Sequence, residues 1–525
     1  MQGRLGRHPW LAAAIVGTIA VGILVAGTIV IVTWGTRRTV RSAVEAAEPA
    51  RRPPRISPDY TEIVVPPNLA PLNFVIREPG QQFVVRLHGE AGEAIEVVSR
   101  SPAIRIPPSP WRRLLAASRG RELRWDIFAQ ADGRWLRYQT IVNRVAAEDI
   151  DGYLVYRQIP PVYNRWHEVS IRQRNLTNWN DSLVLAGTTL DVACVNCHSF
   201  AGNDPRRMLL GLRSNRFGRA TLLATDGNVV KLDTALGYTA WHPSGRLAAY
   251  STNQVRQFFH GARDEVREVL DLESALAYYR LDAQDSKRVP GASDSQQLAT
   301  YPTWSPDGRW LYYCRAPRLW TDDEAVPPAR YAEVQYALMR IPYDIATDRW
   351  GEPETVLAAH QAGGSILLPR ISPDGRFLLF CVCSHGCFPA LEPTSDLYLL
   401  ELATGTHGKP PINSEFSESW HSWSSNSRWI VFSSKRQGGT FTRPYLSYVD
   451  QSGQAHKPFV VPQSDPEFYD SFLQTFSVPE LVTGPVPVSP AALARAARAE
   501  AIRVEDATGE ASRVENSDPY LQADP

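Results

Sequence analysis

A fourfold internal repeat constrains the fold of this 525-residue chain more than any other feature. Each copy consists of a turn, an arginine and an apolar strand, and the four copies read WHPSGRLAAYST (241–252), WSPDGRWLYYCR (304–315), ISPDGRFLLFCV (371–382) and WSSNSRWIVFSS (423–434). The four arginines are 63, 67 and 52 residues apart, and a second apolar strand follows each of them. Repeats of this length that contain several strands are typical of the blades of a β-propeller.

The repeated motif has a simple physical interpretation. Proline fixes φ at the start of a turn, aspartate caps the turn, and glycine supplies a positive φ. The strand that follows is apolar on both faces, because Trp310, Tyr312 and Cys314 alternate with Leu311 and Tyr313. A strand that packs between two neighbouring blades needs two apolar faces. We therefore interpret the aspartates of these turns as structural.

The repeats resemble those of TolB and its relatives. The resemblance covers roughly residues 205–480 and implies a TolB-like, WD-repeat-like β-propeller with five or six blades. The composition agrees, since 15 Trp, 20 Tyr and 17 Phe beside only three Met favour strands over helices. The fold class that we expect is therefore mainly β.

The regions around the propeller have a different character. Residues 36–59 are basic and rich in Ala and Pro, and we expect a linker there. Residues 60–150 contain short alternating runs and a DG turn, which predict a small β-sandwich. We take residues 151–204 as a segment that carries the cysteine motif discussed below. Residues 481–525 are predicted to be an Ala/Pro-rich, partly disordered tail with a helix at 491–503.

Residues 1–35 are predicted to contain a transmembrane anchor. The 23 residues at 11–33 carry no charge and, as a helix, would span about 35 Å against a hydrocarbon core of about 30 Å. Trp10 and Trp34 stand at its two ends, where amphipathic rings prefer the membrane interface. A cleaved signal peptide is the alternative, but its apolar region normally has about 7–15 residues. No other run is comparable, so we expect a single-pass protein.

Cys194, Cys197 and His198 form a CxxCH sequence, the attachment motif of c-type haem. Two thiols three residues apart on one turn can reach both vinyl groups of a haem, and the adjacent histidine can ligate the iron as proximal ligand. The alternatives are a local disulfide, which leaves the histidine unexplained, and half of a zinc site, which needs two further ligands. The surrounding TTLDVACVNCHSFAG resembles the haem loops of c-type cytochromes and implies one covalent haem c.

This resemblance also bears on localisation. More arginines follow the apolar run than precede it, which would place the body of the chain in the cytoplasm. Long domains can translocate against that rule. Haem attachment to CxxCH in bacteria is implied, by the resemblance to c-type cytochromes, to occur outside the cytoplasmic membrane. We therefore expect the main body on the periplasmic side.

The sixth ligand of the iron is left open by the sequence. A methionine is common in c-type cytochromes, and Met208 lies ten residues after His198, although it also begins the apolar run MLLGL. A histidine such as His260, outside the repeat core, is the second candidate. An open or water-bound position is the third.

A second group of cysteines lies in the third repeat, as Cys381, Cys383 and Cys387 around His385. Metal binding there is disfavoured for Cys381, because Cys314 and two serines occupy the same position in the other repeats. That position is expected to take a small buried residue. A Cys383–Cys387 disulfide in an oxidising compartment remains an alternative.

The charge balance and the absence of several catalytic motifs reduce the number of function classes to consider. With 55 basic and 55 acidic residues, we expect no nucleic-acid partner. The chain contains no G-x-S-x-G, phosphate-binding loop or H-E-x-x-H motif. We therefore expect electron transfer or redox sensing, with a redox or envelope protein as partner. The alternatives are a TolB-like envelope scaffold or ligand-binding propeller with a structural haem, and a propeller enzyme such as a polysaccharide lyase that uses metal-bound histidines.

Overall fold

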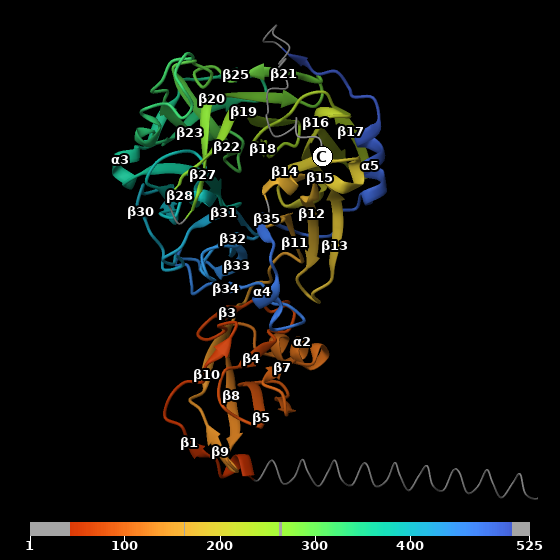
Figure 1. Ribbon diagram of the computed structural model, residues 1–525, viewed down its shortest axis with the longest axis vertical. Helices are drawn as coiled ribbons and strands as arrows, with labels where there is room; N and C mark the ends of the chain where they lie inside the picture. The colour runs from red at the N-terminus through yellow and green to blue at the C-terminus, as the bar shows by residue number, and fades with distance from the viewer. Residues whose placement is uncertain (1–42, 162, 262–264, 507–525) are drawn as a thin grey trace, which may run out of the picture.

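Six sheets of antiparallel strands stand side by side around a common axis in the described part of the chain (Figure 1). The computed structural model describes residues 43–161, 163–261 and 265–506, and only the backbone at 163, 164, 166, 197 and 506. The innermost strands of the six sheets contact one another in a closed ring, in the order β14, β18, β22, β27, β31 and β35. This arrangement is a β-propeller, and each sheet is one blade.

Blades 1 to 3 follow one another along the chain. Blade 1 contains β14 (Ala193–Ala201), β15 (Asp204–Ser214), β16 (Gly218–Thr225) and β17 (Asn228–Leu232). Blade 2 contains β18 (Thr239–Trp241), β19 (Leu247–Phe259), β20 (Arg267–Arg280) and β21 (Asp285–Arg288). Blade 3 contains β22 (Gln297–Trp304), β23 (Trp310–Pro317), β24 (Ala337–Asp344), β25 (Arg349–Trp350) and β26 (Glu354–Leu357).

The last three blades complete the ring. Blade 4 contains β27 (Ser365–Ile371), β28 (Phe377–Cys383), β29 (Asp396–Glu401) and β30 (His407–Gly408). Blade 5 contains β31 (Glu418–Trp423), β32 (Trp429–Ser434), β33 (Arg443–Tyr448) and β34 (Phe459–Val460). Blade 6 contains β11 (Tyr153–Ile159), β12 (Ser170–Asn175), β13 (Asp181–Ala186) and β35 (Thr475–Val482).

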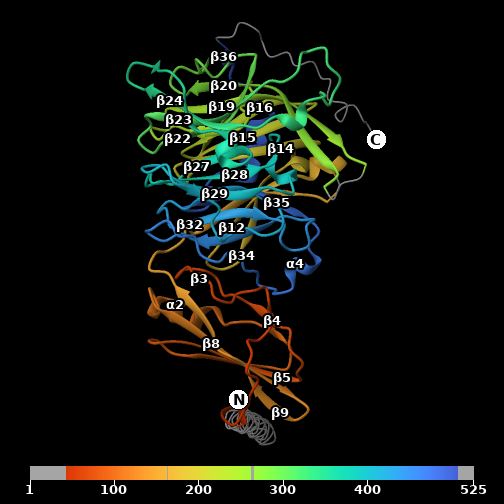
Figure 2. The same ribbon diagram turned by 90° about the vertical axis from the view of Figure 1, so that its left-hand side faces the viewer.

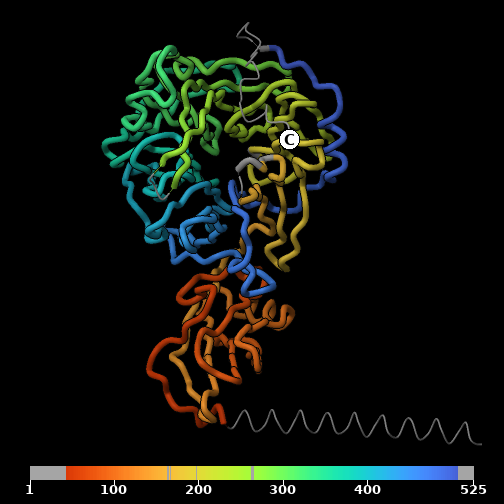
Figure 3. Tube along the Cα trace, viewed as in Figure 1, coloured from red at the N-terminus to blue at the C-terminus, as the bar shows by residue number. Residues whose placement is uncertain are grey.

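Blade 6 joins the two ends of the propeller. Its innermost strand β35 comes from the end of the propeller sequence and pairs antiparallel with β11 from its beginning, with Leu154 opposite Leu481. The chain trace in Figure 3 shows the blue C-terminal segment returning to the first strands of the ring. The propeller therefore starts at Tyr153 rather than at residue 205, and the segment 151–204 is part of two blades.

The turns of the repeat are closed by serine and aspartate side chains. Ser305 Oγ accepts a hydrogen bond from the backbone N–H of Trp310 at 3.0 Å and donates one to Asp307 Oδ1 at 2.6 Å. Gly308 follows with φ 72°. In the repeat that reads SSNSR, Ser427 adopts φ 62° at the glycine position. The aspartates are thus turn residues, and the strands that follow are buried, as the repeat predicts.

A separate domain precedes the propeller and lies below it in Figures 1 and 2. Its larger sheet contains β1 (Glu48–Pro49), β3 (Val64–Val65), β5 (Gln82–Gly89), β6 (Ile95–Ser99), β8 (Glu122–Ala131), β9 (Arg134–Arg137) and β10 (Ile141–Val145). Its smaller sheet contains β2 (Ile56–Ser57), β4 (Phe74–Ile76) and β7 (Ala103–Ile104). Phe74 stacks on Trp125 between them, with ring centroids 5.3 Å apart. The expected linker therefore contributes a strand to each sheet, β1 to the larger one and β2 to the smaller one.

The helices are short and lie between the strands. They are α2 (Pro108–Ala117), α3 (Ala359–Ala362), α4 (Phe468–Ser471) and α5 (Pro490–Arg498), with 3-10 helices η1 (Tyr163–Glu168), η2 (Gly187–Leu190), η3 (Tyr331–Glu333) and η4 (Pro389–Leu391). Helix α5 buries Leu493 and Ala497 against blades 1 and 6, and β36 (Glu505–Asp506) pairs with β21. The tail is therefore ordered as far as Asp506, and the remainder, 507–525, lies outside the described residues.

The predicted membrane anchor at residues 11–33 also lies outside the described residues. Within the described ranges, the model contains no helix with the length and apolar character that a membrane crossing requires.

Candidate functional site

The CxxCH motif lies in β14, the innermost strand of blade 1. Eight residue pairs join this strand to β15, with Cys194 opposite Arg213 and His198 opposite Leu210. The register shifts between Asn196 and His198, so position 197 is a β-bulge. The expectation that the motif forms one turn is therefore wrong for this structure, because pairing with β15 holds it in an extended conformation.

The bulge in β14 recurs in the innermost strands of other blades. The register shifts at the same point in β22, β27, β31 and β35. The residues at these bulges have left-handed backbone conformations, namely Tyr301, Leu368, Trp420 and Val478. Aligned on the bulge, the segments read CHSF (197–200), YPTW (301–304), LPRI (368–371), WHSW (420–423) and VPEL (478–481). The second cysteine of the motif thus occupies a bulge that recurs in the innermost strands of other blades.

His198 and His421 occupy equivalent positions in this alignment, and their environments differ. Both imidazoles are buried, with 3% and 5% of the residue exposed. His421 Nε2 donates to the carbonyl oxygen of Leu379 at 3.0 Å, and its Nδ1 lies 3.9 Å from the sulfur of Cys381. Neither ring nitrogen of His198 has a hydrogen-bond partner among the described residues. The imidazole of the CxxCH motif is therefore the unsatisfied member of the pair.

The electrostatic surroundings keep His198 neutral. Burial lowers its pKa to about 3, and the nearby charge of Arg157 acts in the same direction. The backbone carbonyls of Val155 and Val478 oppose this shift, but neither makes a hydrogen bond of normal geometry with the ring. A neutral imidazole with a free nitrogen is the form that binds metals.

The first cysteine of the motif is a buried free thiol. Asn196, between the two cysteines, donates from Nδ2 to Cys194 Sγ at 3.0 Å. Arg157 of the neighbouring blade donates from Nη1 to Asn196 Oδ1 at 2.6 Å. These contacts hold the segment between the cysteines against blade 6.

Met208, the first candidate for a sixth ligand, is fully buried in β15 opposite Phe200. It is the diagonal neighbour of His198 on the adjacent strand, and the Phe200 ring lies 5.9 Å from the imidazole. Met208 and His198 therefore lie on the same side of the β14–β15 ladder rather than on opposite sides of a shared space.

His260, the second candidate, lies at the end of the long β19–β20 hairpin. Its Nε2 is 2.6 Å from Glu268 Oε2, and the other oxygen of Glu268 is 3.0 Å from His385 Nε2. The structure thus brings His260 together with His385 rather than with the CxxCH motif. Glu268 was missed by the sequence analysis, because its partnership with His385 joins residues 117 positions apart.

The remaining cysteines are buried thiols. Cys314 and Cys381 occupy equivalent strand positions and are fully buried, as the repeat predicts. Cys383 Sγ donates to the carbonyl of His385 at 3.2 Å, and Cys387 Sγ to that of Val269 at 3.3 Å. Burial raises the pKa of both thiols. Cys383 and Cys387 therefore form no disulfide in this structure.

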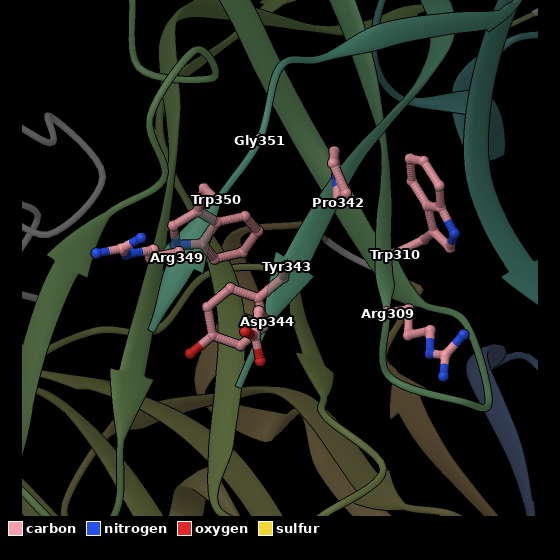
Figure 4. Close-up of a pocket in the computed structure, with 8 residues that line it drawn as sticks. All are labelled: Arg309, Trp310, Pro342, Tyr343, Asp344, Arg349, Trp350 and Gly351. Atoms are coloured by element: carbon pink, nitrogen blue, oxygen red, sulfur yellow. The ribbon is translucent and has the colours of Figure 1, made fainter. Parts of the chain in front are cut away.

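An open pocket of about 530 Å³ lies on blade 3 (Figure 4). Trp310, Trp350 and Tyr343 contribute aromatic rings to its lining, and Arg309 and Arg349 contribute charge. The pocket is lined by Arg309 and Trp310 of the repeat and by none of the candidate haem ligands.

Comparison with known proteins gives only distant similarities. No family model matches the chain, and no curated protein matches it. A chain of a nidogen/laminin complex is 8% identical, with a TM-score of 0.38 over 63% of this chain and 99% of that one. The tricorn protease is 12% identical, with a TM-score of 0.33 over 77% and 36%. Prolyl oligopeptidase B from Galerina marginata is 10% identical, with a TM-score of 0.32 over 64% and 42%. Similarities at this level carry no argument about function.

Proposed function

We propose that this chain is a membrane-anchored, extracytoplasmic redox protein in which a TolB-like propeller carries one haem c. The observation that carries the proposal is the contrast between two equivalent histidines. His421 is satisfied by backbone and sulfur partners, whereas His198, which stands in a CxxCH sequence, is buried and has no hydrogen-bond partner for either ring nitrogen among the described residues. A buried polar group without a partner is costly, and a bound metal is one explanation for it.

The residues present fit a haem in the chemistry of their donor atoms. Cys194 and Cys197 would hold it through thioether bonds, and His198 would bind the iron. The haem, when bound, supplies reversible one-electron transfer. Arg157 and Asn196 would hold the attachment segment in position, because their hydrogen bond ties β14 to blade 6. The strand ladder would restrict motion of the whole site.

The sixth position of the iron is proposed to be open or occupied by water. Met208 lies on the same side of the sheet as His198, and His260 is engaged by Glu268. An open position would suit the sensing of a small ligand better than simple electron transfer.

Haem staining on a denaturing gel tests the proposal, because thioether bonds survive denaturation. The full chain, produced with an intact haem-attachment system, should stain, and Cys194→Ala/Cys197→Ala should not. Cys383→Ala/Cys387→Ala is the matched control, since it removes two buried thiols elsewhere, and it should stain like the wild type. An unstained wild type would overturn the redox proposal and leave the scaffold alternative.

A further inference from the structure

The β19–β20 hairpin is much longer than its blade requires. Its strands have 13 and 14 residues, whereas β18 and β21 beside them have 3 and 4. The extra length reaches across to other blades (Figure 1). Val269 accepts a hydrogen bond from Cys387, beyond the end of β28 in blade 4, and Glu265 pairs with Lys435 near blade 5 at 2.7 Å. These two contacts attach the hairpin to blades 4 and 5.

A cluster of metal-ligating side chains lies where the hairpin meets blade 4. Glu268, His385 and Glu392 each offer one ligand atom, and these three atoms lie within 4.8 Å of one another. All three residues are buried, with 3%, 7% and 5% exposed. His260 adds a second imidazole, since its Nε2 lies 2.6 Å from Glu268. Its side chain is 19% exposed, so the cluster is reachable from solvent on that side.

The orientation of His385 is that of a metal ligand. Its Nδ1 is hydrogen-bonded to Ser384 Oγ at 2.9 Å, which leaves Nε2 directed at Glu268. Ligating histidines are commonly oriented by a hydrogen bond at the other ring nitrogen. The two oxygens of Glu268 each face an imidazole nitrogen, Oε1 that of His385 and Oε2 that of His260.

We propose that Glu268, His385 and Glu392, with His260 at the edge, form a binding site for a divalent transition-metal ion such as Zn²⁺. Imidazole nitrogen and carboxylate oxygen suit such ions, and three protein ligands leave a further position for water or a small ligand. Glu268 comes from the hairpin and the other two from the segment after β28, so the ion would fasten the hairpin to blade 4. This site is separate from the CxxCH motif and does not depend on haem attachment.

Zinc binding by the full chain in the Cys194→Ala/Cys197→Ala background tests this proposal, because that background removes the two thiols of the CxxCH motif and the haem that they would attach. Isothermal titration after chelator treatment should show one equivalent of Zn²⁺. Glu392→Gln and His385→Gln should each weaken binding at least tenfold. Ser384→Ala, which removes only the orienting hydrogen bond, should weaken it about 10–100-fold.

His88→Gln is the control, because His88 pairs with Asp126 at 3.0 Å in the N-terminal domain. It should bind zinc as the background does. The alternative is that His260, Glu268 and His385 form only a hydrogen-bonded clasp. Absence of binding in the background protein, or equal weakening by His88→Gln, would overturn the metal site. Melting curves show whether each variant is folded. Zn²⁺ should raise the melting temperature of the background protein, because a ligand that binds the native state stabilises it.

Discussion

His198 and His421 provide a test of whether the imidazole of the CxxCH motif exists for binding or for packing. The perturbation is replacement of each by leucine, which has a similar size and no polar atoms. The test is made in haem-free protein, with Cys194→Ala/Cys197→Ala as the background. In that background His198 has no iron to bind, so only its effect on folding is measured.

The structure gives opposite signs for the two replacements. A neutral imidazole has one donor and one acceptor, and in His198 both are buried and find no partner in the part of the chain that the structure describes. Leaving such a group unsatisfied costs about 1–3 kcal/mol, so His198→Leu should stabilise the haem-free protein by an amount of that order. His421→Leu removes the 3.0 Å hydrogen bond from the imidazole to the carbonyl of Leu379. It should therefore destabilise the protein by about 0.5–1.5 kcal/mol.

Urea unfolding followed by tryptophan fluorescence measures both effects as shifts of the transition midpoint. His198→Leu should raise the midpoint and His421→Leu should lower it, with unchanged slopes. In the haem-loaded protein the two replacements should also differ in the visible spectrum, which His198→Leu should alter and His421→Leu should not. If His198→Leu lowers the midpoint as much as His421→Leu does, His198 is a core residue like its counterpart, and the argument from its unpartnered nitrogens fails.

Four further predictions concern an ion pair, a contact between blades, the iron ligand and the membrane topology. The hydrogen bond from Arg52 lowers the pKa of Glu78 from 4.5 to about 2. The ionised Glu78 therefore stabilises the folded protein above pH 4.5, and this contribution is lost as the pH falls toward 2. Glu78→Gln should reduce the change in unfolding free energy over this pH range by about 1–2 kcal/mol, after allowance for the exposure of Arg52. Trp241→Phe should lower the unfolding free energy by about 1 kcal/mol in urea titrations, because Trp241 Nε1 donates to the carbonyl of Ser199 in the neighbouring blade. Met208→Leu should leave the visible spectrum and the reduction potential unchanged, and a change in either would show that Met208 binds the iron after all. Protease added to intact spheroplasts should digest the body of the chain, whereas protection would place the body in the cytoplasm.

The sequence predicted the propeller because its blades repeat a local signal. The turn of each repeat is built by side chains within five residues, as Ser305, Asp307 and Trp310 show, and such signals can be read without tertiary information. Blades 1 and 6 lack this turn signature, and their strands β11 to β14 were assigned to a separate segment at 151–204. Their strands are held by pairing between distant residues, such as Leu154 with Leu481, and no local pattern reports that partnership.

The two candidate sites also differ in how far the local sequence predicts them. The CxxCH spacing identifies Cys194 and His198 directly, but not the strand in which they lie. The cluster around Glu268 was missed, because its ligands come from two blades and meet only through an unusually long hairpin. The sequence does carry a weak signal, namely that the third repeat continues after its strand into the segment CSHGC without a regular turn.

The equivalence of CHSF and WHSW limits what a histidine at this position can mean. A propeller blade accepts a buried histidine after its bulge without any cofactor, since His421 is accommodated by the carbonyl of Leu379. The histidine of the motif is therefore not sufficient reason to infer an iron site. What distinguishes blade 1 is that two cysteines precede the histidine and that, within the described ranges, its imidazole has no counterpart of the hydrogen bonds found in blade 5. Because both blades share one architecture, the chain contains its own control, and any property of His198 that His421 also shows must be attributed to the propeller rather than to haem.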